Sequence, residues 1–430
     1  MGSEYLFSDV QGPNLDHPDS AIRLASVVHR FCMPQIGTKR KVSFAKSFST
    51  VGRSDKGRKL MLNADDARQR LVDACSASKV SADRVVGDAK RYSPLIHTIL
   101  LSCKVQPESA RLDDKLVFEW YSGVEAKPKP FASEAIMYDL TMTIVTEGLG
   151  YVLSATEQSM AGEFAAASRA YAGAAGVFDF LARDHLPQWI AKGSKVTGDS
   201  LPSECHAPFA KALSILFQAS GQQMAVATVL MKPGTPNYSL LAKLCLGIAE
   251  HLEDFMSMLR REAFDQQSRM EKEFFTLLAF QISVQSSLSL YFQARNLWAS
   301  DEHGLAVAIL SEATVALRTR SSEASSGVPD VTRSAGLVAL QKELEDLRQH
   351  MALLLRTWER DNSSVYFESV PQHVPAGKKL QEGLQMKKKI EYKLEDVEPV
   401  LLELPEGSLQ RSDSDLAREL QERLNAGDDF

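Results

Sequence analysis

The 430-residue chain has few of the features that mark an enzyme or a metal protein. Its five cysteines are scattered, and no two of them lie closer than 28 residues apart. Because there is no CxxC pair, neither a zinc site nor a disulfide framework is predicted, and reduced, buried thiols are expected. The GxxxxGK[ST] and HExxH motifs are absent, and the nine histidines never fall at metal-binding spacing. The sequence therefore predicts a protein that is not an enzyme and holds no metal or cofactor.

An excess of positive charge is also missing. The net charge is −6 and the pI is near 5.9, so nucleic-acid binding is not expected. No apolar run approaches the ~20 residues that span a bilayer, and the N-terminus lacks the basic and apolar regions of a signal peptide, so we expect a cytoplasmic protein. Two basic clusters, Lys39–Lys41 and Lys387–Lys389, leave two interpretations open: a solvated face, or peripheral contact with an anionic membrane.

Helical periodicity is what the sequence has in abundance. Apolar residues recur at three- and four-residue spacing in most of the chain, which predicts an all-α protein. The expected helices cover residues 64–78, 82–101, 133–155, 160–181, 209–231, 238–261, 271–299, 305–318 and 336–360. One short segment, Lys41–Phe48, alternates polar and apolar residues, and this pattern predicts a small strand or β-hairpin near the N-terminus.

Residues 274–317 form the most informative pair of expected helices. Large apolar side chains alternate with alanines on both sides of a polar turn at residues 301–304, as in a helical hairpin of the tetratricopeptide kind. Such hairpins build surfaces that hold other proteins, so a binding role is the first hypothesis. His303 follows two acidic residues, Asp301 and Glu302, and could form an acid/base pair with one of them. Its place in a turn between helices favours instead a structural role in capping the helix ends.

Composition divides the chain into three parts. We expect an N-terminal arm at residues 1–38, a helical domain at residues 39–404 and an acidic, flexible tail at residues 405–430. Within the domain, the expected helices 133–155, 160–181 and 209–231 are apolar around much of their circumference. Most of these side chains must form the core, and a minority could line a groove for an amphipathic helix of a partner.

Several segments, in the right order, resemble one known family. They are Phe118-Glu119-Trp120, the helix SEAIMYDLTMTIVTEGLGY at 133–151, LSILFQASGQQ at 213–223, LAKL at 241–244, YFQA at 291–294 and WERDNSSVYFESVP at 358–371. Over residues 40–375 the chain thereby resembles the Bro domain family, and in particular its short, stand-alone members. It departs from the family pattern at Leu140-Thr141, where a Phe-Asn pair is usual.

The resemblance implies a boomerang-shaped helical solenoid with tetratricopeptide-like hairpins at its core. It implies a non-enzymatic adaptor, recruited to endosomes, that acts in multivesicular-body sorting or membrane remodelling. The implied partner is the C-terminal amphipathic helix of an ESCRT-III subunit (the Snf-seven or charged multivesicular body protein type), held in a concave apolar groove. The same fold serving as a scaffold for a GTPase or kinase signalling pathway is the alternative.

Six residues are predicted to contact this partner. On the resemblance, the apolar contacts are Ile144, Phe178, Leu181, Leu213 and Leu216, and Lys243 is the expected partner of acidic side chains.

Overall fold

The computed structural model describes residues 41–48, 54–106, 116–127, 129–191, 200–232, 235–319, 327–332, 337–385, 389–402 and 418. The predicted N-terminal arm lies outside the described residues, and so does the predicted acidic tail apart from position 418. Most of the two basic clusters also lies outside them.

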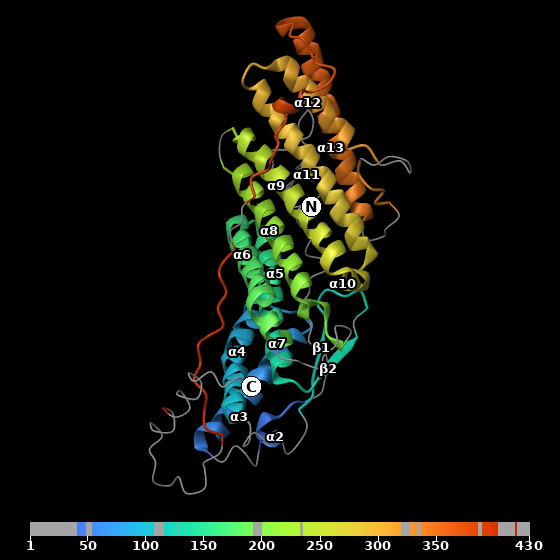
Figure 1. Ribbon diagram of the computed structural model, residues 1–430. Coiled ribbons are helices and arrows are strands. Elements are labelled where there is room, and N and C mark those ends of the chain that lie inside the picture. Colours follow the sequence, from blue (N-terminus) through green and yellow to red (C-terminus); the bar gives the residue numbers. More distant parts are fainter. Residues whose placement is uncertain are drawn as a thin grey trace. The chain divides into compact units, whose positions relative to one another are not determined.

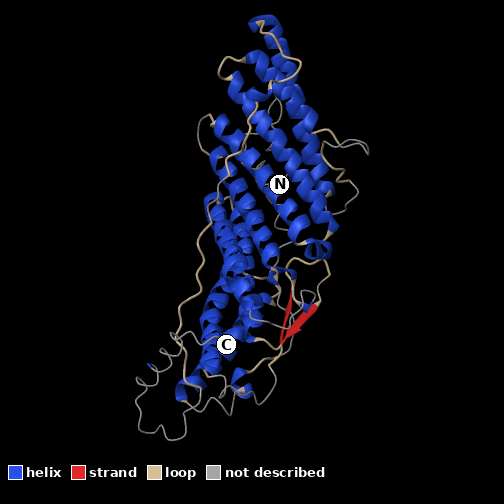
Figure 2. Ribbon diagram, viewed as in Figure 1, coloured by secondary structure: helices blue, strands red, loops and turns tan. Residues whose placement is uncertain are grey.

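The described chain is helical throughout most of its length, with one small sheet (Figure 2). The helices are α2 Phe44–Ser47, α3 Asp55–Cys75, α4 Ala82–Val105, α5 Ile136–Met160, α6 Phe164–Phe180, α7 Leu186–Ala191, α8 Ala207–Leu230, α9 Tyr238–Glu262, α10 Phe264–Arg269, α11 Lys272–Trp298, α12 His303–Ala316 and α13 Val338–Asp361. The strands are β1 Phe118–Tyr121 and β2 Pro130–Ser133. The all-α prediction with a small β-hairpin is confirmed.

The chain forms two compact units. Among the described residues, unit 1 takes in those within 155–175 and 212–390, and unit 2 those within 41–154, 176–211 and 391–402. Helices α5, α6 and α8 contribute residues to both units.

Unit 2 is organised around one buried carboxylate. Asp139, near the start of α5, is fully enclosed and accepts hydrogen bonds from three side chains. Arg68 on α3 donates through two nitrogens at 3.2 and 3.3 Å, Tyr92 on α4 donates at 2.5 Å, and Trp120 on β1 donates at 2.7 Å. Because a buried charge is tolerated only when it is paired and hydrogen-bonded, this network ties α3, α4, α5 and the sheet together.

The prediction of a strand at Lys41–Phe48 is wrong. Residues 44–47 form the short helix α2, and the sheet lies instead at β1 and β2, paired antiparallel with Phe118 opposite Ser133. The carboxylate of Asp65 on α3 explains the difference. It accepts the backbone N–H of Phe44 at 2.6 Å and that of Ala45 at 3.2 Å, which are donors that a helix leaves unpaired at its N-terminus. Phe44, Ser47 and Phe48 are the buried residues of this segment, at the three- and four-residue spacing of a helix.

Unit 1 contains the predicted hairpin. Helix α11 packs against α9 on one side and α12 on the other, and α12 packs against α13 (Figure 1). The turn between α11 and α12 spans residues 299–302, where Asp301 takes a left-handed conformation with φ of 61°. The prediction of two helices joined by a tight polar turn is confirmed, but the turn lies two residues earlier than predicted, because His303 and Gly304 already belong to α12.

Helix α11 is long and apolar enough to cross a membrane by length and composition, the one such helix among the described residues. Core helices pass the same test, and 61% of its apolar window is buried inside the fold. Its side chains Phe274, Leu278 and Tyr291 are each at most 1% exposed. Enclosure between α9 and α12 accounts for its apolar composition.

Candidate functional site

The five apolar residues predicted to contact a partner all lie in the core. Ile144 on α5, Phe178 on α6, Leu181 just after it, and Leu213 and Leu216 on α8 are each 0% exposed. The expectation that these side chains line an open groove therefore needs correction. They present no surface in this structure, and contact with a partner through them stays a prediction without an exposed face to support it.

Close packing of the helices explains this burial. In unit 2, a Cβ placed on Gly148 of α5 would lie 2.8 Å from the ring of Phe178, so the ring rests directly on the α5 backbone. In unit 1, Ser214 of α8 donates to the carbonyl of Ala175 on α6 at 2.7 Å. Helices that approach this closely leave no groove between them.

Thr141, where the sequence departs from the family pattern, is also buried. It is 0% exposed, and its hydroxyl lies 2.8 Å from Nε2 of His185. Burial lowers the pKa of His185 to about 4, so this ring is neutral at physiological pH. The departure thus affects an internal polar contact rather than an exposed patch.

Lys243 is the predicted site residue that does reach the surface. It stands on the outer face of α9, whose other face is buried against α11. Leu240 and Leu246 are half-buried on the same outer side. A lysine between two partly exposed leucines gives this stretch, which we name the α9 face, both apolar surface and a positive charge.

An extended segment crosses α9 beside Lys243. We name residues 379–385 the strap. The backbone N–H of Leu384 donates to the carbonyl of Lys243 at 2.8 Å, and the side-chain amide of Gln222 on α8 donates to the carbonyl of Leu384 at 2.7 Å. The Leu384 side chain is 43% exposed, so the strap adds a third leucine to the α9 face.

Two glycines allow the strap to approach so closely. A Cβ on Gly383 would lie 2.1 Å from the backbone nitrogen of Gly247 on α9, and a Cβ on Gly247 would lie 2.3 Å from the carbonyl oxygen of Leu384. The carboxylate of Glu250 accepts the N–H of Gly383 at 2.8 Å. Any side chain at either glycine would therefore push the two backbones apart.

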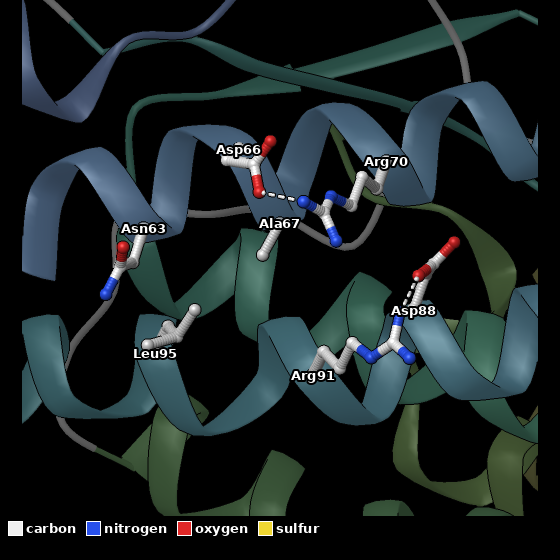
Figure 3. A pocket seen from close by; sticks show the side chains of 7 residues that line it. All are labelled: Asn63, Asp66, Ala67, Arg70, Asp88, Arg91 and Leu95. Atoms are coloured by element: carbon white, nitrogen blue, oxygen red, sulfur yellow. Dashed lines mark hydrogen bonds and ion pairs between the residues drawn. The ribbon is translucent and has the colours of Figure 1, made fainter.

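A small charged pocket lies between α3 and α4 (Figure 3). Its volume is about 220 Å³, and its lining residues are Asn63, Asp66, Ala67, Arg70, Asp88, Arg91 and Leu95. Asp66 pairs with Arg70 at 2.8 Å and Asp88 pairs with Arg91 at 3.2 Å, so the charges neutralise each other. No serine, cysteine or histidine lines it, and the described part of the chain holds no group of three or more metal-ligating side chains. This pocket offers no catalytic constellation.

Comparison with known proteins identifies the fold. The family model described as the BRO1-like domain matches residues 50–406. The chain belongs to the BRO1-like domain family. No curated protein sequence matches it.

Three solved structures share the fold at low sequence identity. A Bro1 domain described under endosomal targeting has a TM-score of 0.61 at 15% identity, over 82% of this chain and 90% of that one. The "ALIX BRO1 CHMP4C complex" has a TM-score of 0.59 at 15% identity, over 89% and 98%. ALIX in complex with the SIVmac239 PYKEVTEDL late domain has a TM-score of 0.63 at 16% identity, over 92% of this chain but only 52% of that longer one.

Sequence reasoning missed the strap as part of the α9 face. Residues 379–385 show neither helical nor strand periodicity, so nothing in their pattern indicates where they lie. The usable signal is a pair of glycines, Gly247 inside an amphipathic helix and Gly383 in a polar segment, since isolated glycines often mark close backbone approach.

Proposed function

We propose that this BRO1-like protein is a non-enzymatic adaptor that binds the C-terminal amphipathic helix of an ESCRT-III subunit, in endosomal sorting or membrane remodelling. The observation that carries the proposal is the family membership, together with a structural neighbour that is a BRO1 domain in complex with CHMP4C. BRO1 domains are protein-interaction modules, which supports an adaptor role.

The α9 face is the surface that suits this partner best. An amphipathic helix offers apolar side chains at three- and four-residue spacing, and Leu240, Leu246 and the strap's Leu384 provide partly exposed apolar surface to receive them. Lys243 between them fits an acidic residue of the helix, and such a charge contact sets orientation and register. Recruitment to an endosomal membrane would follow from binding this partner.

A titration tests the proposal. A fluorescent peptide of an ESCRT-III C-terminal helix is added to the full chain, and its anisotropy is followed. We expect a dissociation constant in the micromolar range, about −8 kcal/mol. Leu240→Asp and Leu384→Asp each place a charge on the α9 face without entering the core, and each should weaken binding at least tenfold.

Lys272→Glu is the matched control for surface charge. Lys272 is exposed at the first position of α11, where a negative charge is favourable to the helix. This variant should bind the peptide as the wild type does. If the wild type fails to bind any ESCRT-III helix, the proposed function is wrong; if Leu240→Asp and Leu384→Asp both bind normally, the proposed surface is wrong.

A further inference from the structure

A second exposed apolar surface lies at the end of α13, in unit 1. Four large apolar side chains occur within six positions: Val365 is 63% exposed, Tyr366 44%, Phe367 74% and Val370 43%. We name residues 362–370, together with the rings that support them, the aromatic corner. Single exposed apolar residues are ordinary, but a contiguous group of them marks a surface used for contact.

Stacked rings hold the aromatic corner in place. Tyr366 stacks on His303 with ring centres 3.6 Å apart, and Trp298 stacks on Trp358 at 4.3 Å. Trp298 also meets the ring of His303 edge-on at 4.7 Å. The corner is therefore anchored to the turn between α11 and α12 as well as to α13.

The backbone of the corner is fixed by two side chains. The amide of Asn362 donates to the carbonyl of Glu368 at 2.9 Å and accepts its N–H at 3.2 Å. The carboxylate of Glu368 accepts the N–H of Gly304 at 2.7 Å and meets Nδ1 of His303 at 3.0 Å. A surface ordered in advance loses little conformational entropy when a partner binds.

Phe367 ends the helical turn at residues 362–366, and its backbone N–H donates to the carbonyl of Asn362 at 2.7 Å. Its φ is 56°, in the left-handed region that a bulky side chain rarely adopts and that glycine adopts without strain. Its ring is 74% exposed, so burial repays little of that strain. Strained residues of this kind cluster where a fold serves binding.

The charges around the corner define the partner. Arg360 pairs with Asp361 at 3.0 Å and Lys378 pairs with Glu302 at 3.3 Å, so these four residues add no net charge. The carboxylates at the rim are Asp301, at 94% side-chain exposure and 3.9 Å from Nε2 of His303, and Glu368, which meets Nδ1 of the same ring. Hydrogen bonds from Gly304 and His303 lower the pKa of Glu368 below its ordinary value, which keeps this carboxylate ionised.

The geometry points to a docking surface for a short segment of a partner protein in which one or two large apolar side chains are flanked by lysine or arginine. The apolar side chains pack on Val365, Phe367 and Val370, and the basic residues meet Asp301 and Glu368. A basic side chain can also lie over the exposed rings of Tyr366 and Phe367, because aromatic faces attract cations. The acidic rim disfavours an anionic lipid surface, which attracts basic protein surfaces.

The test uses a random 12-residue peptide library displayed on phage, selected against the full chain. The selected peptides are then passed over the Phe367→Gly variant, and those that bind it are discarded. This variant removes the ring and relieves the left-handed strain, so its melting temperature should equal or exceed that of the wild type. We expect surviving peptides to carry large apolar residues next to lysine or arginine. Synthesised, they should bind Phe367→Gly at least tenfold more weakly than the wild type, and binding should weaken as salt is raised.

Three outcomes overturn the proposal. The first is that every selected peptide also binds Phe367→Gly, so that counter-selection removes all of them, or that the selected peptides carry acidic residues beside their apolar ones. The second is co-sedimentation of the wild type, but not of Phe367→Gly, with phosphatidylserine vesicles, which would make the corner a membrane contact. The third is a wild-type dimer in sedimentation equilibrium that Phe367→Gly abolishes, which would make it an interface between two copies.

Discussion

At the scale of single residues, side chains of the same type at similar helix positions differ in how far they are buried. Leu216 on α8 and Leu240 on α9 are leucines in helices of similar length, yet the first is 0% exposed and the second is half-buried at the surface. Residue type and period predicted that both lie in helices, which is correct. They could not predict which one faces solvent, because helices and a strap distant in sequence decide that.

Leu216→Asp should therefore destabilise the fold rather than report on binding. Placing an unpaired carboxylate at a fully enclosed position is expected to lower the free energy of unfolding by about 4 kcal/mol or more. Urea unfolding followed by circular dichroism measures this. Leu384 is 43% exposed, so Leu384→Asp should lower the free energy of unfolding by less than about 1 kcal/mol. A Leu216→Asp variant as stable as the wild type would mean that the position is accessible after all.

Glu204 should make stability depend on pH. It is fully buried in unit 2, where it accepts hydrogen bonds from Ser122 at 2.8 Å and from the backbone of Gly123 at 2.6 Å. Burial outweighs these bonds and raises the pKa of Glu204 from 4.5 to about 7. Between those values the folded chain keeps a proton that the unfolded chain releases. This contribution to stability is complete below pH 4.5 and is lost as the pH rises to about 7.

The free energy of unfolding, measured in urea at several pH values, should thus fall with rising pH by up to roughly 3 kcal/mol from this group. Glu204→Gln cannot titrate, so its profile should be flatter over the same window. Glu157→Gln, at an exposed position on α5, serves as the control and should keep the wild-type slope. A Glu204→Gln profile as steep as the wild-type one would show that Glu204 is not the group responsible.

At the scale of elements, periodic segments were predictable and irregular ones were not. The long helices and the α11–α12 hairpin follow from apolar spacing, whereas the short helices α7 and α10 were not predicted. The strap and α2 do not follow from apolar spacing either, because each is positioned by side chains far away in sequence: Asp65 for α2, and Gln222 and Glu250 for the strap. The aromatic corner was visible only as the segment WERDNSSVYFESVP, whose spacing says nothing of the rings it meets.

Gly383→Ala should release the strap from α9. The added Cβ would lie 2.1 Å from the nitrogen of Gly247, which is backbone and cannot move aside as a flexible side chain could. We expect the amide of Leu384 to exchange its hydrogen much faster, while helical circular dichroism stays close to that of the wild type. Gly377→Ala is a matched control, since a Cβ there meets nothing within 4 Å. Equal protection of Leu384 in both variants would contradict the close contact.

At the scale of the whole molecule, the family could be recognised from the sequence, but the proposed binding surface could not. Short segments occurring in the right order indicated a Bro-like domain, and the family model matches residues 50–406. The predicted contacts then fell in the core apart from Lys243, because an apolar helix in a multilayered fold is enclosed on most sides. The α9 face and the aromatic corner emerge only when exposure and contacts are considered together.

Reversing the charges on both sides of the proposed contact tests most directly the claim that the α9 face binds the ESCRT-III helix. An ESCRT-III C-terminal helix peptide and a version with its acidic residues changed to lysine are each titrated, by calorimetry, into the wild type and Lys243→Glu. If the α9 face holds the helix, Lys243→Glu binds the native peptide at least tenfold more weakly than the wild type does. The lysine peptide should then bind Lys243→Glu more tightly than the native peptide does, which recovers part of the lost affinity. If both peptides bind wild type and Lys243→Glu with equal affinity, the helix does not dock at Lys243.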